Sequence, residues 1–241
     1  MNQVLKLSNI CYSISGLEIL KSLDLNVAEQ QYYAIAGVNG AGKSTIIKLI
    51  LDLIRPQPGG EIRIFGSHNQ DRSCRDQLAY LPEKFDVKKN ITGQQYLDFI
   101  ASIYRQDLSK AKVSELAGRL DFPPDRLDSR VGGYSKGMVQ KLGLVSCFML
   151  DRKLIILDEP LSGLDPRARY HFKELLREER SSQRTILYST HLLADAEDLC
   201  DQFGILHGGE MKYQGTPADC MQSFHADSLE QAYMRCISTM A

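Results

Sequence analysis

The strongest chemical signal is a glycine-rich segment that ends in lysine and serine. Residues 37–44 are Gly-Val-Asn-Gly-Ala-Gly-Lys-Ser and fit the pattern G-x-x-x-x-G-K-[ST] at every defined position. In such a loop, backbone N–H groups surround phosphate oxygens, the lysine reaches the β- and γ-phosphates, and the serine hydroxyl binds Mg²⁺. The segment predicts a nucleoside triphosphate site, whose expected contacts are Gly37, Asn39, Gly40, Ala41, Gly42, Lys43, Ser44 and Thr45.

Two adjacent carboxylates follow an apolar stretch in the second half of the chain. The run 154–157 is Leu-Ile-Ile-Leu, and Asp158, Glu159 and Pro160 come directly after it. In open α/β sheets, ligands bind at the carboxyl ends of the strands. Asp158 would bind Mg²⁺, as the Walker-B aspartate does, and Glu159 could orient or deprotonate the attacking water. Asp-Glu-Pro alone would also suit a solvent-exposed strand end, but its pairing with the glycine-rich loop favours catalysis.

The spacing of apolar residues predicts the elements that position these groups. Alternation predicts strands at 4–7, 23–27 and 61–66, and a continuous apolar run predicts a buried strand at 32–36. Helical spacing follows at 45–54. A strand therefore precedes the glycine-rich loop and a helix follows it, which is the context that a phosphate-binding loop needs.

A helical segment interrupts the strand-rich pattern at about 85–150. Thr92 to Gln95 fits a capping box, and the apolar stripe after it, Tyr96, Phe99 and Ile103, is expected to be core. Further helices are predicted at 113–120 and 135–150.

Strands at 154–157 and 185–189, with a helix starting at Pro166, restore the alternation of strand and helix. The pattern predicts an α/β fold with a mostly parallel sheet core, an N-terminal antiparallel β subdomain and a helical insert. We expect a single domain over 1–222 and a helical tail over 223–241.

Composition narrows the class of protein further. The 241 residues carry 29 basic and 30 acidic side chains, for a net charge of −1, which argues against a nucleic-acid partner. The longest mostly apolar run, 142–150, is shorter than the roughly 20 residues of a membrane span, and the first residues lack a signal-peptide pattern. These features predict a cytoplasmic chain. Its six scattered cysteines suit reduced thiols.

Together, the two motifs resemble those of the ATPase subunit of ABC (ATP-binding cassette) transporters, over about residues 3–220. Further family motifs match in order: Tyr12 as the aromatic that stacks on adenine, Tyr134 to Met138 as the signature, Ser162 to Asp165 as the D-loop and His191 as the switch histidine. The resemblance implies a P-loop NTPase fold that binds ATP and Mg²⁺. It also implies catalytic roles for Lys43, Glu159 and His191.

Two positions depart from the usual family pattern. The signature is Tyr-Ser-Lys-Gly-Met instead of Leu-Ser-Gly-Gly-Gln, and Glu83 stands where the family generally has Gln. Both variants resemble the type-2 exporter branch. The resemblance implies a magnesium ligand set of Ser44, Asp158 and Glu83, and nucleotide contacts from Ser135, Lys136, Gly137 and Asp165.

In the family, the signature helix completes the nucleotide site of a second subunit. The resemblance therefore implies a head-to-tail pair of ATPase subunits, a homodimer or a heterodimer, held at the inner face of the membrane by a transmembrane permease. The insert and the segment around Glu83 would form the groove for that permease, with the candidate apolar anchors Phe85, Val87, Tyr96 and Tyr104.

Two other functions stay open from the sequence. A soluble ABC ATPase of DNA repair or translation would typically carry coiled-coil insertions, tandem cassettes or a basic surface, which the sequence does not show. A regulatory module would bind ATP without turnover, and the retained Lys43, Asp158, Glu159 and His191 argue against it.

Overall fold

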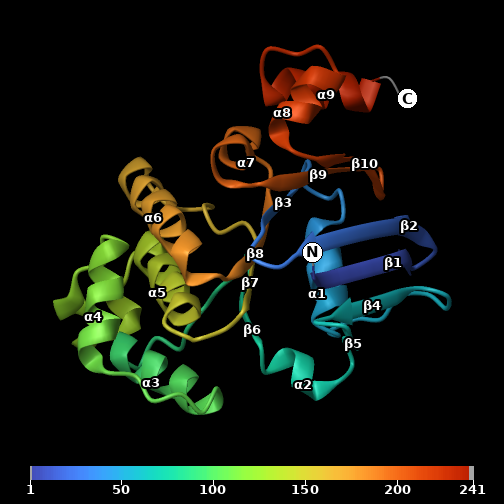
Figure 1. Cartoon of the computed structure of the whole chain (residues 1–241). Coiled ribbons are helices and arrows are strands. Elements are labelled where there is room, and N and C mark those ends of the chain that lie inside the picture. Colours follow the sequence, from blue (N-terminus) through green and yellow to red (C-terminus); the bar gives the residue numbers. More distant parts are fainter. Residues whose placement is uncertain (1, 239–241) are drawn as a thin grey trace.

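Two β-sheets and a helix between them organise the chain (Figure 1). The structure is a computed structural model that describes residues 2–238. Its first sheet is antiparallel, in the order β2-β1-β4-β5, with β1 (Gln3–Ile14), β2 (Leu17–Ala28), β4 (Glu61–Ile64) and β5 (Ser67–His68). Ser15 and Gly16, at φ of 50° and 83°, form a tight turn between β1 and β2.

The second sheet carries the parallel core, in the order β10-β9-β3-β8-β7-β6. Its strands are β3 (Tyr32–Ala36), β6 (Leu78–Leu81), β7 (Leu154–Leu157), β8 (Thr185–Thr190), β9 (Gln202–His207) and β10 (Glu210–Gly215). Strands β6 to β9 run parallel with β3, while β10 pairs antiparallel with β9. The predicted fold class is confirmed. Because β3, β8 and β7 are neighbours in parallel, their carboxyl ends meet at one edge.

Helix α1 (Lys43–Ile50) lies between the two sheets (Figure 1). Alternate residues of β3 point to opposite faces, as in any strand. Tyr33 and Ile35 belong to the core that α1 shares with the antiparallel sheet. Tyr32 and Ala34 belong to the core on the opposite face. That core is covered by α5 (Lys136–Phe148), α6 (Pro166–Glu179), α7 (Leu193–Leu199) and α9 (Leu229–Ser238).

Helix α1 ends four residues earlier than its apolar spacing predicts, at Ile50 rather than Ile54. Asp52 adopts a left-handed backbone with φ of 55°, and the Leu53 N–H donates to the Lys48 carbonyl at 2.9 Å. The Asp52 N–H donates to the Leu49 carbonyl at 3.1 Å. This pair of bonds is a Schellman motif, which closes a helix by satisfying its last carbonyls.

The helical insert contains α3 (Gly93–Ile103) and α4 (Lys110–Arg119) and continues through two 3-10 turns, Pro124–Asp128 and Val131–Gly133, into α5. The predicted capping box is present, with the Gln95 N–H donating to Thr92 Oγ1 at 3.1 Å.

The expectation that the α3 stripe is core is wrong for Phe99 and Ile103, which are 58% and 56% exposed. The helix instead buries Gly93, Leu97 and Ala101, which share a face at intervals of four residues.

Short helices complete the chain: α2 (Arg72–Arg75), a 3-10 turn at Arg180–Ser182, and α8 (Pro217–Ser223), which packs against α9. Helix α9 lies in the predicted helical tail, and it buries Leu229, Ala232 and Tyr233 against α7 and α8. The end of that tail, residues 239–241, lies outside the described residues. Among the helices of residues 2–238, none has the length and apolar character needed to cross a membrane.

Candidate nucleotide-binding site

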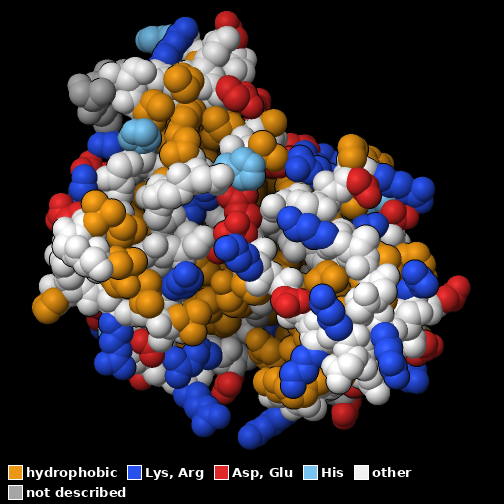
Figure 2. Space-filling view, turned by 180° about the vertical axis from the view of Figure 1, so that it is seen from behind, with side chains coloured by type: hydrophobic (Ala, Val, Ile, Leu, Met, Phe, Trp, Pro, Cys, Tyr) orange, Lys and Arg blue, Asp and Glu red, His pale blue; other side chains and the backbone are white. Residues whose placement is uncertain are grey.

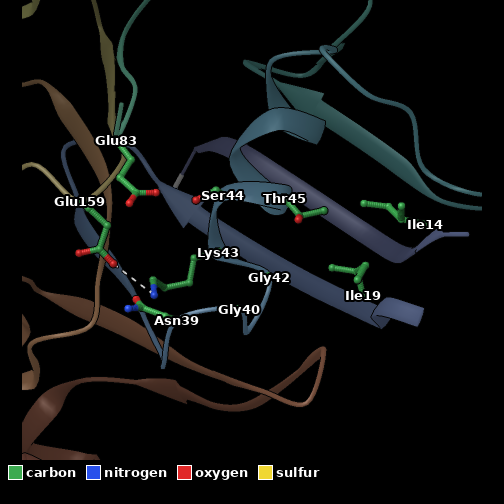
Figure 3. A pocket seen from close by; sticks show the side chains of 10 residues that line it. All are labelled: Ile14, Ile19, Asn39, Gly40, Gly42, Lys43, Ser44, Thr45, Glu83 and Glu159. Atoms are coloured by element: carbon green, nitrogen blue, oxygen red, sulfur yellow. Dashed lines mark ion pairs between the residues drawn. The ribbon is translucent and has the colours of Figure 1, made fainter. Parts of the chain in front are cut away.

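The glycine-rich loop forms one side of a pocket at the carboxyl edge of the parallel sheet. Figure 3 shows the loop and the start of α1 facing side chains from the strand ends. The lining residues come from β1 and β2, from the loop and α1, and from the ends of β6 and β7: Ile14, Ile19, Asn39, Gly40, Gly42, Lys43, Ser44, Thr45, Glu83 and Glu159. The pocket therefore brings together most of the residues predicted from the two motifs.

The loop needs glycine where the chain passes close to its neighbours. A Cβ at Gly37 would lie 2.5 Å from the Leu206 carbonyl oxygen. Gly42 has φ of 112°, and a Cβ there would lie 2.8 Å from the Leu20 side chain. Only glycine, which has no Cβ, avoids these two close contacts. The two positions therefore fix the path of the loop against β9 and β2.

The Lys43 ammonium lies inside the pocket, at the first turn of α1. Its Nζ donates to the Gly37 carbonyl at 2.8 Å and to the Val38 carbonyl at 3.2 Å. It also forms an ion pair with Glu159, with 3.2 Å between Nζ and Oε1. Lys43 is only 6% exposed. Water therefore screens its charge weakly, and the charge acts on groups inside the pocket.

Ser189 fixes both carboxylate residues from the neighbouring strand. Its hydroxyl donates to Asp158 Oδ1 at 2.6 Å and accepts the Glu159 N–H at 2.8 Å. No motif in the sequence indicates this role. The available signal was a serine at the end of the otherwise apolar 185–189 strand, close in sequence to His191.

Negative charge is concentrated at this edge of the sheet. Burial, together with the charges of Asp158 and Glu83, raises the pKa of Tyr80 on β6 to about 12. A tyrosine so placed stays neutral at ordinary pH. The charged groups at this edge are therefore the carboxylates and Lys43.

Glu159 has a conformation that is rare for a residue with a side chain, with φ of 50°. Its Oε2 lies 2.8 Å from His191 Nδ1, while its Oε1 is buried beside Lys43 Nζ and accepts no hydrogen bond from residues 2–238. Gln140 on α5 donates to the Pro160 carbonyl at 3.1 Å and so holds the next residue. An unusual backbone held by several neighbours is typical of functional sites.

The donor set at this edge suits Mg²⁺. The ion takes hard oxygen ligands, of which one or two are usually carboxylates, and keeps several waters. Ser44 and Glu83 line the pocket, and the Asp158 carboxylate is buried with Oδ1 already held by Ser189. A hydroxyl and a carboxylate thus face the pocket, while Asp158, next to the lining residue Glu159 in sequence, is buried and outside the lining. This set of hard oxygen donors fits the ion.

Tyr12, expected to stack on adenine, is not among the lining residues of the pocket. Tyr12 pairs with Leu20 and Ser13 pairs with Glu18, so Ile19 is the extra residue of a β-bulge. A bulge changes the direction of nearby side chains. Ile14 and Ile19 line the pocket, while Tyr12 is half-buried against the core around α1.

The signature residues lie away from this pocket. Ser135 begins α5 and accepts the Met138 N–H at 3.2 Å, while Lys136 is exposed beside Gly163. Asp165 begins α6 and accepts the Ala168 N–H at 2.8 Å. Gly137 also faces Gly163, whose carbonyl oxygen would lie 3.5 Å from a Cβ at position 137. These two segments therefore form one surface that is separate from the lining of the pocket.

Comparisons with known proteins agree on the class. The family model described as ABC transporter matches residues 20–162. An uncharacterised ABC transporter ATP-binding protein of Nostoc is 33% identical over 82% of this chain, which spans 59% of that relative. A solved ATP-binding subunit of an ABC transporter is 35% identical with a TM-score of 0.87, covering 97% of this chain and 99% of that one.

A dimeric ATP-binding cassette in a post-hydrolysis state, bound to ADP and Pi, shares the fold with a TM-score of 0.78 at 20% identity. That match covers 88% of this chain and 98% of the other. The fold and the pocket define a P-loop ATPase domain. The chain belongs to the ABC transporter family.

Proposed function

We propose that this chain binds and hydrolyses ATP and drives an ABC exporter through a separate transmembrane permease. The observation that carries the proposal is the meeting of Lys43, Glu159 and His191 in and beside one pocket. Phosphates attract the ammonium and the loop N–H groups, while the carboxylate can act on water.

Glu159 is the group that activates water in this proposal. Lys43 pairs with Glu159 here, and a bound triphosphate would take the ammonium onto its oxygens. The buried Oε1 can then accept a proton from the water that attacks the γ-phosphorus, with release of ADP and phosphate. His191 holds Oε2 and orients the carboxylate. Ser44, Asp158 and Glu83 would hold Mg²⁺, which neutralises phosphate charge.

A second copy would complete the site. Ser135 and Lys136 are exposed, and they lie outside the pocket that holds Lys43. The helix start at Ser135 offers N–H groups and a positive dipole end to a phosphate. In a head-to-tail pair, ATP bound to one chain would meet Ser135, Gly137 and Asp165 of the other, so ATP would favour the closed pair.

The insert offers a surface for the permease at the inner face of the membrane. The candidate anchor Val87 is buried and cannot contact a partner. The exposed Phe99 and Ile103 take its place as apolar anchors in this proposal. Figure 2 shows Lys and Arg side chains at the lower edge of the molecule, where α2 and α3 lie, with hydrophobic side chains nearby. An adjacent hollow is lined by Arg72, Arg75, Asp76, Ile103, Tyr104, Arg105 and Arg152. Its charge suits an acidic segment of the partner.

Phosphate release tests the proposed activity. Purified protein with Mg²⁺ and ATP is expected to release phosphate. Glu159→Gln should lower the rate by at least about 100-fold, because the general base is lost, while ATP binding is retained. Glu197→Gln, an exposed change on α7, is the matched control. Equal turnover in the wild type and Glu159→Gln would contradict the role of Glu159.

The partner is tested by recovering tagged Glu159→Gln protein from gently solubilised membranes. A multi-span membrane protein in near-equal amount, lost in Ile103→Asp, is the expected result. Recovery of ribosomal or DNA-repair proteins instead would assign the ATPase to a soluble machine.

A further inference from the structure

Helix α9 packs at the end of the molecule towards which β3 leads. In Figure 1, α8 and α9 lie beyond β9 and β10, and β3 runs towards that end before it enters the glycine-rich loop. Helix α9 contacts α7, α8 and β10, and it buries Leu229, Ala232, Tyr233 and Cys236. Tyr233 is only 7% exposed. The described part of the C-terminal tail therefore belongs to the core of the domain.

The Tyr233 hydroxyl lies beside the backbone of the glycine-rich loop without a completed hydrogen bond. Its oxygen is buried and has no hydrogen-bond partner among residues 2–238. Burial raises the pKa of Tyr233, whereas the Val38 N–H lowers it, so this N–H lies near the hydroxyl oxygen. A neutral tyrosine hydroxyl can accept as well as donate a hydrogen bond. A buried polar group thus stands next to Val38 and is not paired with it.

Such a hydroxyl lowers the stability of the fold. Nearly all buried polar groups in proteins have a hydrogen-bond partner, so an exception requires an explanation. Phenylalanine would keep the ring and its apolar contacts and would remove the unpaired group. A tyrosine at this position is explained if a second state of the protein uses the hydroxyl.

Lys43 holds the peptide group that lies near Tyr233. Its Nζ donates to the Gly37 carbonyl at 2.8 Å, and that carbonyl belongs to the same planar peptide group as the Val38 N–H. The Gly37 N–H donates to the Thr190 carbonyl at 3.2 Å and fixes the start of the loop. A bound triphosphate would take the Lys43 ammonium, because its bonds to phosphate oxygens are charge-assisted. The peptide between Gly37 and Val38 is then free to rotate.

We propose that Tyr233 is a positioning residue for nucleotide binding, whose hydroxyl accepts the Val38 N–H once Lys43 has left the Gly37 carbonyl. The bond is complete in the loaded loop and incomplete in the free loop, so it increases nucleotide affinity through the difference between two states. This inference rests on the proposed nucleotide-binding function. It adds helix α9 to the elements that hold the loop.

Tyr233→Phe in Glu159→Gln protein tests the proposal with two measurements. Without nucleotide, its melting temperature should equal or exceed that of the parent protein, because an unpaired buried group is removed. Its Kd for ATP with Mg²⁺ should nevertheless rise by about five-fold, because the loaded loop loses a hydrogen bond. The Kd of inorganic triphosphate should rise by the same factor, since the loop holds phosphates and not the base.

Tyr170→Phe is the matched control. It makes the same chemical change on α6, where Tyr170 is 60% exposed, and it should alter neither measurement. An unchanged Kd in Tyr233→Phe would overturn the proposal. A lower melting temperature without nucleotide would overturn it too, because the hydroxyl would then already be paired in the free protein. If the parent protein binds neither ATP nor triphosphate, the proposed nucleotide site itself fails.

A double-variant cycle tests the Val38 N–H as the partner of the hydroxyl. Val38→Pro removes this N–H. In the Val38→Pro background, Tyr233→Phe should therefore change the Kd of ATP by less than about two-fold. A full five-fold loss of affinity in that background, at about the size seen without Val38→Pro, would contradict the assigned pair. Thermal unfolding of each variant shows whether the fold is retained.

Discussion

At the residue scale, the Lys43–Glu159 pair of the pocket depends on neighbouring side chains that hold the segment of Glu159 in place. Lys43 and Glu159 were predicted from their own motifs, and they pair in the structure. Ser189 and Gln140 were missed, because a motif describes contacts to a ligand and not neighbours within the fold. The role of Tyr12 stays a prediction, because the one-residue bulge at Ile19 brings Ile14 and Ile19, but not Tyr12, into the described pocket lining.

Ser189→Ala tests the support of the two carboxylates. The change removes the acceptor for the buried Glu159 N–H and the donor to Asp158. We expect the free energy of unfolding to fall by about 1–3 kcal/mol. Turnover should fall by about 10-fold or more, because residues that hydrogen-bond the reacting carboxylates keep them in position. Chemical denaturation and phosphate release measure both effects.

Ser181→Ala is the matched control, since Ser181 is exposed and its hydroxyl donates to the Glu178 carbonyl one turn earlier in the chain. Wild-type turnover in Ser189→Ala would contradict a positioning role for Ser189.

At the scale of elements, apolar periodicity predicted most strands and helices because each buries one face. Helix ends were less predictable. The end of α1 depends on the left-handed Asp52, which has no periodic signal. The exposed face of α3 was also mispredicted, because its small residues Gly93 and Ala101 form the buried side.

Charged groups join α6 to α7, the helix that follows His191. Lys173 Nζ lies 2.9 Å from Asp195 Oδ1 and 3.1 Å from Asp198 Oδ2. The Asp195 side chain is only 7% exposed. Lys173→Met leaves that carboxylate without its partner, so we expect the free energy of unfolding to fall by about 2–4 kcal/mol. Thermal unfolding measures the loss, with the exposed Lys112→Met on α4 as control.

Acid should weaken the same connection. Burial raises the pKa of Asp198, but hydrogen bonds and charges from Lys173 and Arg177 outweigh burial and hold it below its usual value. A carboxyl whose pKa is lowered by folding stabilises the fold at pH values above its unfolded pKa of about 3.9. That stabilisation is lost as the pH falls through the folded pKa. At pH values under about 4, the melting temperature of the protein should therefore decrease. A drop of equal size in Lys173→Met would contradict this origin.

At the scale of the whole molecule, the order of the motifs predicted the fold class, because each motif occupies a fixed strand or helix end. The residues alone could not show where the signature lies relative to the pocket within one chain. The structure separates the signature surface, at Ser135 and Lys136, from the pocket that contains Lys43. That separation is the physical basis for expecting a second copy at the site.

The most direct test is therefore phosphate release by Ser135→Arg, with ATP binding measured in parallel. Ser135 is exposed at the start of α5 and is not a lining residue of the pocket. If a second copy completes the site, a bulky cation there should lower turnover by at least about 100-fold while one chain still binds ATP. Wild-type turnover in Ser135→Arg would contradict the account, because the site would then be complete within a single chain.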